Sequence, residues 1–285
     1  MASSVTLRFY NVETSHDSDR FEDVLRKIFS MTMKSREALL HSGVAIRLEH
    51  LEESSGVLYG DFTRVQESNL PGQVLDDETK KLPFDRLGHY IVFAYDPSAK
   101  ALALQFDRIA RAGVVLSYVS NFAENGVYAH NALVSGTDSL KALETSDVKS
   151  FRVRLGGIHK FEDANSTKND FIETLNTMGD FFDGRQIEVK ISTRATKSPM
   201  DASNVVSTIK SLLHLKDESD NVKAIYADTF GEHDPYNFIK ELLRETGELD
   251  LPDNDPIGNR EKRIEFAKKS YDKHKSPLRS QNKPD

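Results

Sequence analysis

The segment 183–197, DGRQIEVKISTRATK, contains residue types that suit two kinds of nucleic-acid chemistry. Glu188 and Lys190 are two positions apart on a predicted strand, so both side chains point to the same face. In one nuclease superfamily, an Asp and a Glu hold a divalent cation while a Lys orients the attacking water. With Asp183 as the second carboxylate, the segment is therefore a candidate metal-dependent nuclease site.

The spacing argues against that interpretation. Asp183 and Gly184 form a predicted turn that leads directly into the strand, whereas the upstream carboxylate of such nucleases usually lies on a separate strand. Any acid-x-Lys pair on a strand shares a face, so the pattern is common. The nine histidines never pair at a spacing of two or four, and the chain has no P-loop, GxGxxG or GxSxG motif. We expect no catalytic residue, no metal and no cofactor.

The basic residues around this strand support phosphate binding instead. On the preceding predicted strand, SFRVRL, the apolar residues alternate with Arg152 and Arg154, which point outward together. If the two strands are parallel neighbours, Lys190 shares their face. The alternative is a solvated face on which Glu188 pairs with a neighbouring arginine. The candidate phosphate contacts in this half of the chain are Lys149, Arg152, Arg154, Arg185, Lys190, Arg194 and Lys197.

Two other segments supply further basic candidates. The C-terminal helix predicted over 259–275 has a narrow apolar seam of Ile264, Ala267 and Tyr271, which would pack on the body and leave a basic face outward. A lysine-rich terminal helix is equally typical of a solubility feature. The second segment lies just before the helix predicted at 113–126, where basic side chains and the backbone N–H groups of the helix start would both favour an anion. The C-terminal helix adds the candidates Arg260, Arg263, Lys268 and Lys269. The second segment adds Arg108 and Arg111.

Composition limits the class of protein. The chain has 285 residues, no cysteine and a formal net charge of −7. The absence of cysteine excludes disulfides and suits a reducing cytoplasm, and the longest apolar runs are too short for membrane insertion. Because nucleic-acid binders are usually basic, DNA binding must depend on local clusters. The acidic charge favours another class, a protein-interaction module that does not bind DNA.

The hydrophobic periodicity predicts an α+β fold, with a mixed-sheet globular domain and a smaller β-α-β-α-β subdomain. The globular domain is expected over 1–158, with C-terminal helices of 229–275 packed on it. The subdomain is expected over 159–228, with parallel strands, and a disordered tail over 276–285. Strands are predicted at 4–13, 43–54, 56–66, 89–96, 101–106, 148–157, 185–192 and 221–228, and helices at 18–29, 113–126, 166–182, 198–215, 234–247 and 259–275.

The order of several segments resembles a known family. These segments are RFY near the start, LGHYIVFAYDPSAKALALQFDRIARAGVVLSYVSNF, VYAHNALVSGTDSLKAL, VKSFRVRLGG, LNTMGDFFDG and RQIEVKISTRATK. Over roughly residues 5–215 the chain resembles the RexA family of phage-exclusion proteins of lambda-type prophages, and more loosely the KwaB-type anti-phage proteins. In RexA the matching strand is basic but lacks the Glu-x-Lys pair, which further weakens the nuclease interpretation.

The resemblance implies a cytoplasmic homodimer that binds double-stranded DNA with little sequence preference in defence against phage. It implies that the smaller subdomain serves dimerisation, and that a membrane-protein effector or a phage protein is a further partner. The sequence therefore supports three hypotheses: a non-enzymatic DNA-binding protein, a metal-dependent nuclease using Asp183, Glu188 and Lys190, and a protein-interaction module that senses a phage component without binding DNA.

Overall fold

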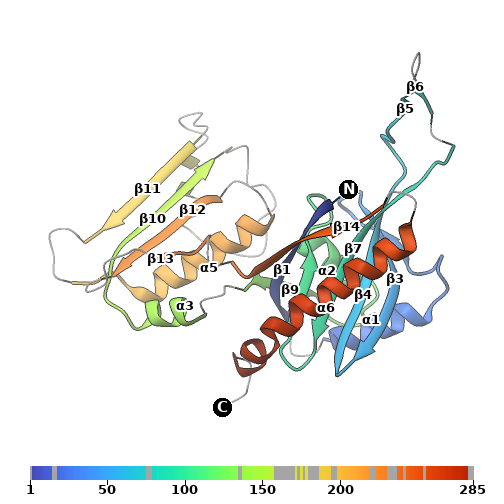
Figure 1. Cartoon of the computed structure of the whole chain (residues 1–285). Helices are drawn as coiled ribbons and strands as arrows, with labels where there is room; N and C mark the ends of the chain where they lie inside the picture. Colours follow the sequence, from blue (N-terminus) through green and yellow to red (C-terminus); the bar gives the residue numbers. More distant parts are fainter. Residues whose placement is uncertain are drawn as a thin grey trace. The chain divides into compact units, whose positions relative to one another are not determined.

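The computed structural model divides the chain into two compact units, each with its own sheet (Figure 1). The larger unit comprises Met1–His130 and Arg244–Asp285, and the smaller comprises Asn131–Leu243. Helices and strands occur in both, so the predicted α+β class is confirmed. The described residues are 2–14, 18–74, 79–81, 83–133, 137–156, 171, 174–175, 177–178, 186–193, 198–218, 222–229, 236–239, 242–252 and 255–281.

The larger unit is built on an eight-stranded sheet with the order β14-β1-β8-β7-β4-β3-β2, and β9 pairs with β1 outside this series. Neighbours in the series pair antiparallel, so the mixed sheet that we predicted is replaced by an antiparallel one. The strands are β1 (Ala2–Thr14), β2 (Glu37–Leu39), β3 (Ala45–Ser54), β4 (Val57–Gln66), β7 (Leu87–Asp96), β8 (Ala101–Gln105), β9 (Tyr128–Ala132) and β14 (Arg244–Asp250). A separate pair consists of β5 (Gln73–Val74) and β6 (Thr79–Lys80).

Local sequence explains two of the turns. Ser55 and Gly56, between β3 and β4, both have positive φ, as a two-residue hairpin with the strand twist requires. The DPSAK segment joins β7 and β8, where the Asp96 carboxylate accepts a hydrogen bond from the Ser98 N–H at 2.9 Å. Both hairpins match the prediction.

Helices cover both faces of the larger sheet. Phe62 of β4 packs against Tyr118 of α2 (Ala112–Ser120), with ring centres 5.7 Å apart. Its neighbour Asp61 points to the opposite face, towards α6 (Pro256–Gln281), which also contacts β7, β14, β1 and β8. The third helix, α1 (Phe21–Ser30), packs on β3 and α2. Ile264, Ala267 and Tyr271 are buried, so the predicted apolar seam of the C-terminal helix is confirmed.

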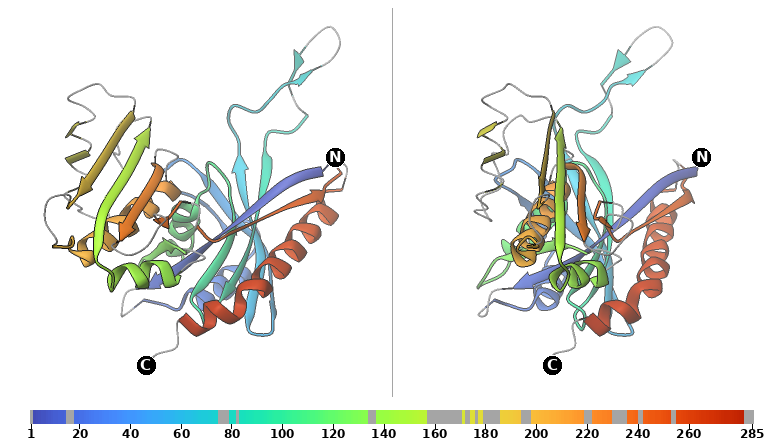
Figure 2. Two further views of the ribbon diagram at one scale, coloured as in Figure 1. Left: turned by 60° about the vertical axis from the view of Figure 1, so that its left-hand side comes forward. Right: turned by 90° about the vertical axis from the view of Figure 1, so that its left-hand side faces the viewer.

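The smaller unit has a four-stranded sheet with the order β11-β10-β12-β13, and helices on one face (Figures 1 and 2). The elements are α3 (Thr137–Glu144), β10 (Val148–Gly156), β11 (Gln186–Ser192), α5 (Ala202–Glu218), β12 (Val222–Thr229) and β13 (Tyr236–Asn237). Phe151, Val153 and Leu155 of β10 are buried against Ile209 and Leu212 of α5 in one apolar core. All pairs in this sheet are antiparallel, which corrects the parallel arrangement that the alternation of elements predicted.

Several predicted boundaries are also wrong. The first unit boundary lies at 130/131 rather than 158/159, so β10 belongs entirely to the smaller unit. The described residues of the helix predicted over 234–247 are not helical: 236–237 form β13, and 244–247 belong to β14, which pairs with β1 near the other end of the sequence. Instead of a disordered tail after Pro277, α6 continues to Gln281. The helix predicted at 166–182 lies largely outside the described residues.

Candidate nucleic-acid interface

Three predicted basic residues share the face of the smaller sheet that points away from its core. In the antiparallel register, Arg152 lies opposite Lys190 and Arg154 lies opposite Glu188. On the other side of β10, Arg152 lies opposite Tyr226 of β12. Since cross-strand partners point to the same side of a sheet, these side chains form one surface. We call the surface of Arg152, Arg154, Lys190 and Tyr226 the basic face.

Each cation on this face has a different environment. Arg154 Nε donates to Glu188 Oε2 at 2.6 Å, but both side chains are more than a third exposed, so the pair contributes little stability. The Arg152 guanidinium lies 4.5 Å from the centre of the Tyr226 ring, in a cation–π contact. Lys190 is exposed and forms no ion pair with any acid in the described ranges. Lys149 lies beside this face, with its Nζ 3.7 Å from an Asp228 carboxylate oxygen.

The nuclease hypothesis gains no geometric support from this arrangement. The Glu188 carboxylate is engaged by Arg154, whereas a metal ligand would present its oxygens to a cation. Asp183 lies outside the described residues, as do Arg185, Arg194 and Lys197 of the predicted phosphate contacts. Within the described part of the chain, no three His, Asp or Glu side chains are grouped to hold a metal ion.

The basic candidates on α6 are mostly engaged with the larger sheet. Arg260 and Arg263 precede the buried Ile264 and Ala267 by one helical turn, so they lie on the flank that faces the sheet. Burial lowers the pKa of Arg263, whose guanidinium lies 6.0 Å from the Tyr90 ring. Lys268 Nζ lies 2.7 Å from Glu52, and Lys269 Nζ lies 3.4 Å from Glu265. The expected outward basic surface is therefore reduced to a few paired lysines.

The loop before α2 already contains its own anion. Asp107 Oδ1 accepts hydrogen bonds from the N–H groups of Ile109 and Ala110, at 2.8 and 2.7 Å. Arg111 is the residue before the helix, and its Nε donates to the Arg108 carbonyl at 3.1 Å. The aspartate thus occupies part of the donor set that we expected to attract phosphate. Arg108 and Arg111 also belong to the larger unit, so the structure distributes the candidates over two units.

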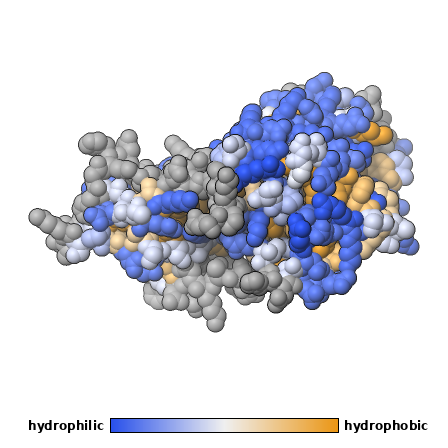
Figure 3. Space-filling view, turned by 90° about the horizontal axis from the view of Figure 1, so that it is seen from below, coloured by the Kyte–Doolittle hydropathy of each residue, from blue (hydrophilic) through white to orange (hydrophobic). Residues whose placement is uncertain are grey.

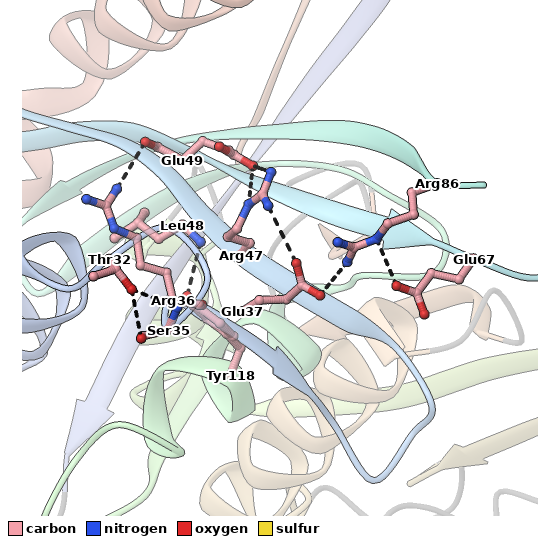
Figure 4. A network of polar contacts seen from close by, with 10 residues as sticks. All are labelled: Thr32, Ser35, Arg36, Glu37, Arg47, Leu48, Glu49, Glu67, Arg86 and Tyr118. Atoms are coloured by element: carbon pink, nitrogen blue, oxygen red, sulfur yellow. Dashed lines mark hydrogen bonds and ion pairs between the residues drawn. The ribbon is translucent and has the colours of Figure 1, made fainter. Parts of the chain in front are cut away.

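Other arginines of the larger unit stabilise its fold, as the polar network in Figure 4 shows. Glu37 pairs with both Arg47 and Arg86, while Arg47 also reaches Glu49 at 2.5 Å and Arg86 reaches Glu67 at 2.8 Å. Arg36 donates to the carbonyls of Phe29 and Met31 and so caps the C-terminal end of α1. Carboxylate and carbonyl groups within the larger unit therefore already balance the positive charges of these arginines.

A groove of about 770 Å³ runs beside α6, lined by residues of α6, β3 and β14. Its charges are largely paired: Lys268 binds Glu52, and Lys262 Nζ donates to the Asp250 carbonyl at 2.7 Å. Most of the surface seen in Figure 3 is hydrophilic, with smaller apolar areas. The basic face of the smaller sheet therefore remains the best candidate interface.

Comparisons with protein-family models, curated proteins and solved structures found no match to this chain. In the described part of the chain, no helix combines the length and apolar character needed to cross a membrane.

Tyr226 was missing from the candidates taken from the sequence. Its outward orientation could have been predicted, because it alternates with Ile225 and Ala227, which are buried. Its contact with Arg152 depends on the register between β10 and β12, which the local pattern does not specify.

Proposed function

We propose that the chain binds double-stranded DNA with little sequence preference through the basic face of the smaller unit. The observation that carries this proposal is the Arg152–Lys190 cross-strand pair, two cations side by side without a carboxylate partner among the described residues. Arg154 lies two residues along β10, so three cations fall within about 5–7 Å of their neighbours. Such a set can follow a phosphate backbone.

The chemistry of the face accounts for low sequence preference. Contacts to phosphate carry no base information, whereas reading bases requires an element that enters a groove. Tyr226 holds the Arg152 guanidinium by its ring, which orients the cation without neutralising it. We further propose that this binding serves anti-phage defence in the cytoplasm, together with a membrane-protein effector or a phage component.

Fluorescence anisotropy with two unrelated duplexes at several salt concentrations tests the proposal. Each phosphate contact contributes about −0.9 to the slope of log K against log salt, so Arg152→Glu with Lys190→Glu should reduce the slope by about 2 on both duplexes. The matched control reverses Lys141 and Lys210, which lie on α3 and α5. Equal binding by the two double variants, or no binding by the unaltered chain at low salt, would refute the proposal.

The same samples separate the nuclease alternative. Degradation of the duplex with added magnesium or manganese, abolished by Glu188→Gln, would replace the proposal with metal-dependent hydrolysis.

A further inference from the structure

Buried polar atoms without a hydrogen-bond partner gather beneath the first half of α6. On β4, both carboxylate oxygens of Asp61 and the hydroxyl oxygen of Thr63 are buried and form no hydrogen bond with a described residue. On α6, the same holds for the Nε atoms of Arg260 and Arg263. Because buried polar groups in folded proteins nearly always have a partner, this cluster is expected to hold water or a ligand.

These four residues and Tyr90 of β7 surround one space between the helix and the sheet. Asp61 and Thr63 are two positions apart on β4, so their side chains point to the same face. Thr63 lies directly opposite Tyr90 in the β4–β7 register, and the Arg263 guanidinium lies 6.0 Å from the centre of the Tyr90 ring. Arg260 precedes Arg263 by one helical turn, and its charge acts on the pKa of Asp61. We call these five residues the polar ring.

The charges of the polar ring do not balance. Neither Arg260 nor Arg263 forms an ion pair with an acid in the described ranges. Burial raises the pKa of Asp61 to about 7 against the effect of Arg260, so its carboxyl group is partly protonated near neutral pH. Water can satisfy N–H groups, but it does not compensate two positive charges, whereas an anion does both.

We propose that the polar ring binds a small oxyanion, the phosphate group of a free phosphate or of a small phosphate ester. The Nε–H groups of Arg260 and Arg263 and the Thr63 hydroxyl donate hydrogen bonds to its oxygens. Hydrogen bonds between a guanidinium and phosphate are among the strong ones in proteins because both partners are charged. Protonated Asp61 is a further donor, since only the acid form of a carboxyl group carries an O–H.

The location of the ring limits the size of the anion. The Nε atoms are buried beneath the helix, so the backbone of a long polymer such as DNA cannot reach them. Arg260 also lines the groove of about 770 Å³ beside α6, which has room for the remainder of a small ester. That groove carries the carboxylates of Glu52, Glu248 and Glu261, so the remainder should be uncharged or cationic rather than a second phosphate.

Equilibrium dialysis with radiolabelled inorganic phosphate at pH 7 tests the site. The unaltered chain should bind one phosphate per chain. Arg263→Gln should weaken binding by about tenfold to a hundredfold, because a charged hydrogen bond is lost. The matched control is Lys275→Gln, which removes the same charge from α6 outside the polar ring and the groove, and it should bind like the unaltered chain.

Thr63→Val is a second variant that keeps the side-chain shape and removes one unpartnered hydroxyl. It should fold normally by circular dichroism and bind phosphate about threefold to tenfold more weakly. Competition with phenyl phosphate identifies the source: tighter displacement than by inorganic phosphate indicates an ester, and weaker displacement indicates free phosphate.

Two results would overturn the proposal. One is the absence of saturable phosphate binding by the unaltered chain, and the other is unchanged affinity in Thr63→Val or in folded Arg263→Gln. The polar ring belongs to the larger unit and the basic face to the smaller one, so both variants should keep the affinity for duplex DNA. Loss of either kind of binding can therefore be told from loss of the other.

Discussion

Replacing Asp61 by Asn should stabilise the protein at neutral and alkaline pH. Asp61 lies on β4 with a fully buried side chain, and neither carboxylate oxygen accepts a hydrogen bond from a described residue. Burial raises its pKa from 3.8 to about 7; Arg260 lowers the pKa in part, and Glu49 raises it. The folded protein therefore prefers a neutral side chain at this position, which Asn supplies with nearly the same shape.

The size and sign of the effect follow from the pKa. Because the folded state binds this proton more tightly than the unfolded state, the contribution of Asp61 to the free energy of unfolding should fall as pH rises from about 4 to about 7 and should be constant above. One pKa unit equals about 1.4 kcal/mol, so ionised Asp61 costs up to about 4 kcal/mol above pH 7. The difference between Asp61→Asn and the unaltered chain should therefore be near zero at pH 4 and approach this value at pH 8.

Urea denaturation at intervals between pH 4 and 8.5, followed by circular dichroism, would measure this difference. Asp272→Asn on α6 is the matched control, because its side chain is exposed and the same charge is removed from the helix that covers Asp61. A difference between Asp61→Asn and the unaltered chain that does not change with pH would refute the argument, because it would mean that Asp61 has the same pKa in both states.

Two other buried polar groups should stabilise the larger unit, so replacing either of them should lower its stability, unlike the replacement of Asp61. Asp96 is fully buried and accepts hydrogen bonds from Tyr271 Oη at 2.7 Å and Arg279 Nε at 2.6 Å, which join α6 to the β7–β8 hairpin. Asp96→Asn weakens these charged hydrogen bonds and should lower the free energy of unfolding by about 1.5–3 kcal/mol, measured by urea denaturation at pH 7. These hydrogen bonds lower the pKa of Asp96 against the opposing effect of burial, so its contribution should be lost as pH falls below 3.8. Tyr118 Oη accepts from the Leu48 N–H at 3.0 Å and donates to the Arg36 carbonyl at 2.5 Å, so Tyr118→Phe should lower the thermal midpoint by an amount equivalent to about 1–3 kcal/mol. An unchanged midpoint would mean that water replaces the hydroxyl.

The elements with strong local signals were predictable from the sequence. β1, α1, the β3–β4 and β7–β8 hairpins and β10 follow from apolar alternation or helical periodicity, with turns marked by Gly, Pro and Asp. β14 was not predictable, because the segment RETGELD has few apolar residues and its partner β1 lies at the other end of the chain. Its stabilisation is tertiary: the Thr6 and Thr246 hydroxyls meet across the strands at 2.9 Å, and Lys273 and His274 of α6 bind Glu245.

The candidate site shows why a face can be predicted while its chemistry cannot. Alternation alone placed Arg152, Arg154 and Lys190 on one side of the smaller sheet, and that placement is the same for parallel and antiparallel neighbours. The ion pairs depend on register: the antiparallel arrangement puts Glu188 against Arg154 and leaves Lys190 opposite Arg152. A slip of two residues would keep every side chain on its face but change these partners. In one direction Lys190 would lie opposite Arg154 and Glu188 opposite Gly156, and in the other direction Glu188 would lie opposite Arg152. Whether Glu188 is paired with an arginine or lies open therefore depends on strand register, which the alternation within a single strand does not specify.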